Sequence, residues 1–184
     1  QRAADLLQDY LPKYYFKLTA ATHLLLPDNL LPMVRNEANM GVDVSMAPVV
    51  IGLAKMLFSK NQEWPELFIA VFQLGRSESD HHRILCFAYL DQLSEEVPEK
   101  LQPHMATLTN MYLAGMQDTA LNVAAAALNS LTAFIEGIGH SNEVLSLKPL
   151  LSPLLVVVQT FAVSGYVVGV IGGLDVISQS VHLE

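Results

Sequence analysis

Apolar residues recur along the chain at the spacing of one face of a helix. Positions three, four and seven residues apart are apolar from end to end, which is typical of amphipathic α-helices. Signals for paired strands are weak, because no Asn-Gly or Asp-Gly hairpin turn occurs. Glycine and proline separate the apolar stretches, so we expect a series of about seven or eight helices.

Helix boundaries are predicted from capping residues and from helix-breaking residues. The residues predicted to cap or open helices are Asp28, Pro65, and Ser79 or Asp80. The residues predicted to end helices are Pro98, Gly115 and Gly139. The expected helices cover roughly residues 2–18, from 28 onward, 43–58, 67–74, 80–97, 101–114, 118–138, 147–163 and 165–180.

The helices come in pairs that repeat along the chain. Similar segments centre on leucines at positions 53, 90, 128 and 174, separated by 37, 38 and 46 residues. HEAT and armadillo units repeat every 40 to 47 residues or so. We therefore predict an all-α fold, a HEAT-repeat solenoid (α-α superhelix) of about four helix pairs. The approximate repeats are 1–58, 64–97, 101–138 and 147–180 of a single array, 1–184, which we expect to be a fragment of a longer solenoid.

Composition and charge narrow the class of protein. Hydrophobic residues make up 52% of the 184 positions and charged residues only 15%, which excludes a disordered chain. The formal net charge of −8 has the wrong sign for neutralising phosphates, so no direct contact with nucleic acid is expected. The single cysteine, Cys86, lies in an apolar run and is predicted to be a buried hydrophobe in a reducing compartment.

A membrane span is an alternative interpretation of the C-terminal region. No charged residue occurs from 149 to 174, a stretch of 26 residues that is long enough to cross a bilayer. Gly165, Gly169 and Gly173 have the spacing found in membrane helix pairs. Pro149 and Pro153 instead favour two soluble helices in phase with the preceding repeats, and on that reading no membrane is contacted.

Patterns typical of catalysis, metal binding or cofactor binding are weak. His81 and His82 are adjacent, so on a helix they point about 100° apart, and no further ligand follows at zinc-site spacing. No Gly-rich phosphate loop or nucleophile elbow occurs. We interpret Trp64, just before an expected helix, as a residue that packs inside the protein rather than one that anchors a protein–protein interface. We expect a protein that is not an enzyme, with no metal and no cofactor.

Polar side chains recur on one face of the expected helix 118–138, in steps of four and three residues. Transfer by the repeat spacing aligns Asp91 and Asp175 with Asn129, aligns Ser94 with Thr132, and places Asp80 level with Asp118. We interpret these positions either as the wet side of surface helices or as a binding surface on the concave side of the solenoid. The candidate protein-binding residues, called the polar row below, are Asp80, Asp91, Glu95, Asp118, Asn122, Asn129, Glu136 and Asp175.

Several short motifs resemble the N-terminal part of a nuclear transport receptor of the importin beta (karyopherin) superfamily. Residues 3–7, with Leu11 and Leu18, resemble an early family helix of the form AAxLLxxxLxxxxxxL. The segment VVIGLAK at 49–55 followed by WPELF at 64–68 is similar to a family helix and the entry of the next one. The segment LQPH at 101–104 is similar to the start of the following repeat, and the subclass with the most similar pattern contains importin four.

The resemblance implies a protein-binding segment of a receptor that carries cargo through the nuclear pore. The implied partners are the GTP-bound form of Ran at the N-terminal repeats, basic cargo proteins and nucleoporins. The implied location is the cytoplasm and the nucleus, with shuttling through the pore. An alternative function, from the HEAT pattern alone, is a scaffold arm of a multi-subunit assembly.

Overall fold

The computed structural model describes residues 6, 10, 11, 13–36, 40–139 and 147–164. These residues contain seven α-helices and no strand. The helices are α2 (Ala20–Asn36), α3 (Met40–Ser59), α4 (Pro65–Leu74), α5 (Asp80–Glu96), α6 (Met105–Met116), α7 (Leu121–Ile138) and α8 (Leu151–Ser164). Short 3-10 turns lie at Tyr15–Lys17, Pro98–Lys100 (η2) and Gln102–His104 (η3). The expected helix 165–180 lies outside the described residues, as do residues 2–5, 7–9 and 12 of the expected helix 2–18.

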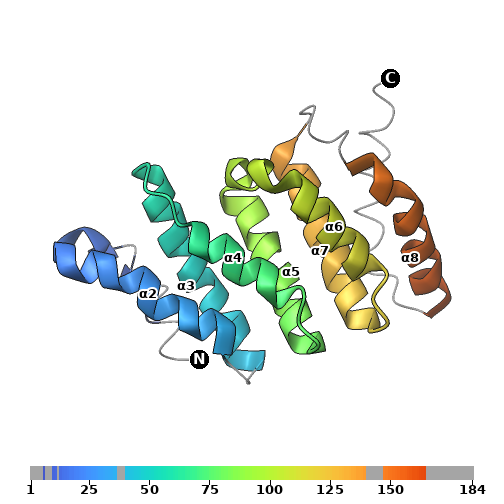
Figure 1. The fold of residues 1–184 in the computed structure, drawn as a ribbon, viewed down its shortest axis with the longest axis horizontal. Helices are drawn as coiled ribbons and strands as arrows, with labels where there is room; N and C mark the ends of the chain where they lie inside the picture. Colours follow the sequence, from blue (N-terminus) through green and yellow to red (C-terminus); the bar gives the residue numbers. More distant parts are fainter. Residues whose placement is uncertain (1–5, 7–9, 12, 37–39, 140–146, 165–184) are drawn as a thin grey trace.

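The helices stack as pairs in two layers. Helices α2 and α3, α4 and α5, and α6 and α7 pack as pairs, and the pairs follow one another in chain order across Figure 1. The second helices form one layer in which α5 contacts both α3 and α7. In the other layer α2 contacts α4, and α6 contacts α8. The fold is an all-α HEAT-type solenoid, as the periodicity predicted.

Local signals account for several helix ends. Pro65 occupies the first turn of α4, where its missing N–H costs no hydrogen bond. Gly139 follows α7 with φ of 59°, a left-handed conformation that glycine adopts without strain. The prediction that Pro98 stops a helix is also confirmed, since α5 ends at Glu96 and a 3-10 turn begins at Pro98.

Two predicted boundaries are wrong. Asp28 does not cap a helix, because it lies inside α2, which begins eight residues earlier. The Thr19 hydroxyl accepts a hydrogen bond from the Thr22 N–H at 3.3 Å and satisfies a free donor at the true start. Gly115 does not end a helix either, because α6 continues to Met116. A Cβ at Gly115 would lie 2.3 Å from the Phe87 ring, so glycine is needed there for close packing.

A run of buried aromatic rings joins α5, α6 and α7. The rings of Phe87, Tyr112 and Phe134 stack in sequence, with centroid distances of 6.0 and 6.1 Å. The Tyr112 hydroxyl lies 3.1 Å from the Ser130 Oγ and 3.3 Å from the Ser130 carbonyl oxygen, so its polar end is satisfied inside the core. These contacts hold the second and third described pairs together.

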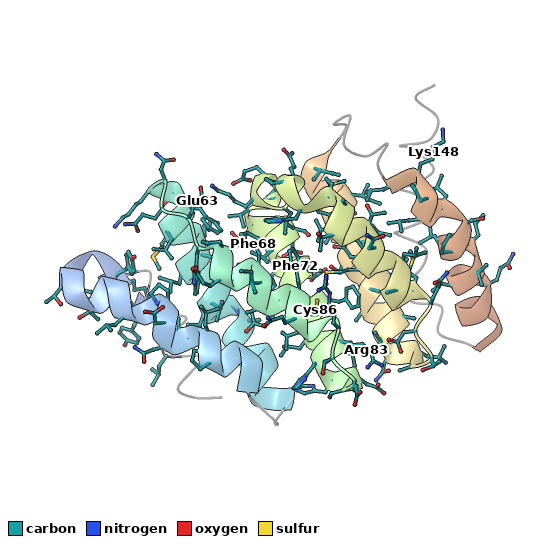
Figure 2. All side chains as sticks on the ribbon, viewed as in Figure 1. Glu63, Phe68, Phe72, Arg83, Cys86 and Lys148 are labelled. Carbon is teal, nitrogen blue, oxygen red and sulfur yellow. The ribbon has the colours of Figure 1, made fainter. Side chains whose placement is uncertain are left out.

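The predictions for two single residues of the core are confirmed. Cys86 is fully buried, and burial raises the pKa of its thiol. Trp64 is 3% exposed and packs in the core beside α4, so it is a packing residue rather than an interface anchor. Figure 2 labels Cys86 on α5 and Phe72 on the neighbouring helix α4.

Candidate protein-binding surface

The polar row is divided among three parts of the structure. Asp80 lies at the N-terminus of α5, and Asp118 lies in the turn before α7. The members in the C-terminal part of α5 are Asp91 and Glu95. The members on α7 are Asn122, Asn129 and Glu136, all exposed. The eighth member, Asp175, lies outside the described residues.

Arg83, labelled at the lower end of α5 in Figure 2, forms ion pairs with both Asp80 and Asp118. Its Nε donates to Asp118 Oδ2 at 2.7 Å, and its Nη2 donates to Asp118 Oδ1 at 3.1 Å and to Asp80 Oδ1 at 2.6 Å. Its Nη1 donates to the carbonyl oxygens of Ser77 at 2.9 Å and Glu78 at 2.8 Å. All of its donor nitrogens are therefore engaged, and one guanidinium links the α4–α5 turn to the α6–α7 turn.

The Arg83 clamp, defined as Arg83 with Asp80 and Asp118, shifts the pKa values of Arg83 and Asp118. Hydrogen bonding to Asp118 is the main cause that raises the pKa of Arg83, against a smaller opposing effect of burial. Burial alone would raise the pKa of Asp118, but hydrogen bonds from Arg83 and from the Ala120 N–H outweigh it and lower that pKa. Asp80 and Asp118 are thus both paired with one guanidinium within the fold, which balances one of their two negative charges.

Sequence reasoning missed Arg83. A signal existed, because Arg83 follows Asp80 by three residues and so shares its face of the helix. The rings of the neighbouring His81 and His82 lie 5.8 Å apart, and His82 Nδ1 lies 2.9 Å from the Ser77 Oγ. Among the described residues, no three His, Cys, Asp or Glu side chains gather as metal ligands.

Asp91 and Glu95 present two like charges one helical turn apart. Asp91 is half-buried and Glu95 is exposed. Burial is the main cause that raises the pKa of Asp91, and the Glu95 carboxylate adds to it by repulsion. Within the described part of the chain, no ion pair is recorded for either residue. A cation placed beside them would relieve this repulsion.

The backbones of α5 and α7 lie close together next to Glu95 and Glu136. A Cβ added to the next residue, Gly137, would meet the carbonyl oxygen of Ser94 at 2.3 Å, so the two backbones approach closely there. Glu95 and Glu136 directly adjoin this contact along the chain, and both are exposed. We call Asp91, Glu95 and Glu136 the acidic trio.

One prediction about the polar positions is wrong. Ser94, aligned with Thr132 on a wet face, is fully buried and donates from its Oγ to the Leu90 carbonyl oxygen at 2.6 Å. The close approach of Gly137 covers it. Thr132 is half-buried and donates to the Leu128 carbonyl oxygen at 3.1 Å. Both hydroxyl groups therefore form hydrogen bonds within their own helices rather than with a partner.

Two other acidic residues are also paired. Glu96 at the end of α5 forms an ion pair with Lys55 on α3. Glu63, in the turn before α4, lies 2.7 Å from Lys100 Nζ on η2. The first ion pair joins the first described helix pair to the second, and the other joins the turns that precede and follow the second helix pair. Among the polar-row carboxylates described, the acidic trio is therefore the part that forms no ion pair.

The membrane alternative has little structural support among the described residues. Helix α7 is long and apolar enough to cross a membrane by composition, with a mean hydropathy of 1.3 over 18 residues. It nevertheless packs on α5 and α6, and half of it is buried inside the protein, as in the core helix of a soluble fold. In the uncharged stretch 149–174, α8 extends from Leu151 to Ser164, and residues 165–174 lie outside the described chain.

Comparison with known proteins adds a family to this geometry. A family model described as "IPO5-like, TPR repeats" matches residues 40–168, which include α3 to α8. A probable importin-5 homolog of Dictyostelium discoideum is 26% identical over 144 residues. The match covers 77% of this chain but only 13% of that protein. TPR and HEAT units are both stacked helix pairs. With more than half of its length matched by the family model, the chain belongs to the IPO5-like family of helical-repeat proteins.

Proposed function

We propose that the chain is a protein-binding segment of a nuclear transport receptor. The family match over residues 40–168 is the observation that carries this proposal. The two-layer stack of helices supports it, because solenoids of this kind present extended surfaces to other proteins. The chain spans 13% of the curated relative that it matches, so cargo transport and nuclear shuttling by the whole protein are part of the proposal. The importin-four subclass remains a prediction from the sequence motifs, since the matched relatives are described as importin-5-like.

The proposed partners are Ran-GTP, nucleoporins and basic cargo. Contact with Ran-GTP and with nucleoporins follows from the resemblance to the importin beta superfamily. Contact with basic segments has support from charge, because the chain carries a net charge of −8 and the acidic trio lies on adjoining second helices. We place the basic segment on the acidic trio rather than on the whole polar row, because Asp80 and Asp118 already form ion pairs with Arg83.

Binding to Ran in its two nucleotide states tests the receptor assignment. The 184-residue chain is immobilised and titrated with Ran loaded with a non-hydrolysable GTP analogue or with GDP. We expect binding of the GTP-analogue form and much weaker binding of the GDP form. Equal affinity for both forms, or no binding to either, would contradict the Ran assignment and favour a scaffold arm, which has no reason to distinguish nucleotides.

Salt dependence tests the charge-based part of the proposal independently. A lysine-rich peptide bound through the acidic trio should lose affinity steeply as the Debye length falls from about 10 Å at 0.1 M salt to about 3 Å at 1 M. An uncharged peptide of the same length is the matched control, and its affinity should not depend on the salt concentration. If both peptides respond alike, charge does not direct binding.

A further inference from the structure

The two interfaces between the second helices are held in different ways. The α5–α7 interface is fixed at both ends of the helices. At the N-terminal ends the Arg83 clamp joins them, and the side chains of Arg83 and Asp118 are only 17% and 11% exposed. At the C-terminal ends the Gly137 backbone lies against the Ser94 carbonyl oxygen and Pro98, where even a Cβ would clash. Neither contact is readily screened by salt, since one is largely shielded from water and the other is steric.

At the C-terminal ends of α3 and α5, two ion pairs with exposed or partly exposed side chains lie beside the buried core. Lys55 and Glu96 have side chains that are 59% and 42% exposed. The second pair, Lys100 with Glu63, is 25% and 67% exposed, and Lys100 Nζ also lies 5.0 Å from the centre of the Phe58 ring. Exposed pairs of this kind contribute little to stability and weaken in salt.

An apolar contact remains between α3 and α5 when the pairs are screened. Leu53, Ala54 and Leu57 of α3 are buried in the same hydrophobic core as Leu90 and Leu93 of α5. Loss of the ion pairs would therefore allow α3 to tilt about this contact without separating from α5. The α5–α7 block would keep its geometry, because its fixing contacts do not depend on exposed charge.

We propose that the α3–α5 interface is a salt-sensitive joint of the solenoid and that α5 to α7 move as one rigid block. Raising the ionic strength, or bringing a charged surface to Lys55 and Glu96, would change the bend between the first described helix pair and the rest. This inference concerns the shape of the array and does not depend on the proposed transport function.

Spin-label distances across the two interfaces test the joint. One doubly labelled chain carries Ser59→Cys and Glu95→Cys, across α3 and α5. A second carries Glu95→Cys and Glu136→Cys, across α5 and α7. All three positions are exposed, and the natural Cys86 is fully buried and should not react. Because both chains share the label at position 95, its own mobility is common to both measurements.

Distance distributions are compared at about 0.1 M and 1 M salt, where the Debye length differs roughly threefold. We expect the α3–α5 distribution to broaden and shift to longer distances in high salt, while the α5–α7 distribution stays unchanged. Adding Lys55→Gln and Lys100→Gln should produce the same broadening in low salt. A separate variant that exchanges the charges of the first ion pair, Lys55→Glu with Glu96→Lys, should again give a narrow α3–α5 distribution in low salt. Equal broadening at both interfaces, or none at α3–α5, would overturn the proposal.

Discussion

Replacement of Arg83 by glutamine should destabilise the fold more than removal of any other surface charge described here. The variant leaves the Asp118 carboxylate, 11% exposed, with the Ala120 N–H but without its cation. Exposed ion pairs contribute about 0 to 1 kcal/mol, and breaking a fully buried pair costs about 3 to 5 kcal/mol. The clamp lies between these limits, so we expect a loss of about 2 kcal/mol in the free energy of unfolding.

Urea denaturation followed by circular dichroism measures this loss, and a double-mutant cycle assigns it. Arg83→Gln, Asp118→Asn and the double variant should give a coupling energy above about 1 kcal/mol. Lys55→Gln is the matched control, because it removes a pair whose members are both more than 40% exposed, and it should cost at most about 0.5 kcal/mol. If Arg83→Gln costs no more than this control, the clamp does not hold the two turns together.

Further predictions concern pH and packing. The pKa of Asp118 is lower in the folded protein than in the unfolded chain, where it is about 3.9. The Asp118 carboxylate should therefore stabilise the fold above about pH 3.9, and this stabilisation should be lost as pH falls through the folded pKa. Asp118→Asn should abolish this pH dependence. Burial lowers the pKa of His104, so unfolding should become easier as pH falls through about 6.5, and His104→Gln should remove that slope in a pH series of urea titrations. Gly137→Ala should cost about 1 to 3 kcal/mol because its Cβ would meet the Ser94 oxygen, whereas Gly52→Ala, with no atom within 4 Å, should be neutral or stabilising in thermal melts.

The pattern of apolar residues predicted most of the fold. Helix periodicity and the spacing of Leu53, Leu90 and Leu128 identified the second helices, and all three leucines are buried. Local rules failed where tertiary contacts outweigh them. Glycine is typical of a helix end, but Gly115 is needed inside α6 because the Phe87 ring of α5 packs closely against it. A single sequence does not show such contacts.

The candidate site was predictable only in outline. Exposure of Glu95, Asn129 and Glu136 followed from their period on the helix. The pairing of Arg83 with Asp118 did not, because the two residues are 35 positions apart and nothing local connects them. Burial of Ser94 depended on the rotation of α5 against α7, which a repeat alignment does not determine.

Charge reversal of the two exposed members of the acidic trio, Glu95 and Glu136, tests the proposed binding surface most directly. The measurement is the affinity of the 184-residue chain for a lysine-rich peptide, with Glu95→Lys and Glu136→Lys compared against a control pair, Glu66→Lys and Glu99→Lys. Both double variants change the net charge equally, and all four positions are exposed, but Glu66 lies on α4 and Glu99 on η2. We predict that the first variant loses peptide affinity by tenfold or more, about 1.4 kcal/mol, while the control loses much less. Equal losses in the two variants would show that only net charge matters and would contradict a binding surface on α5 and α7.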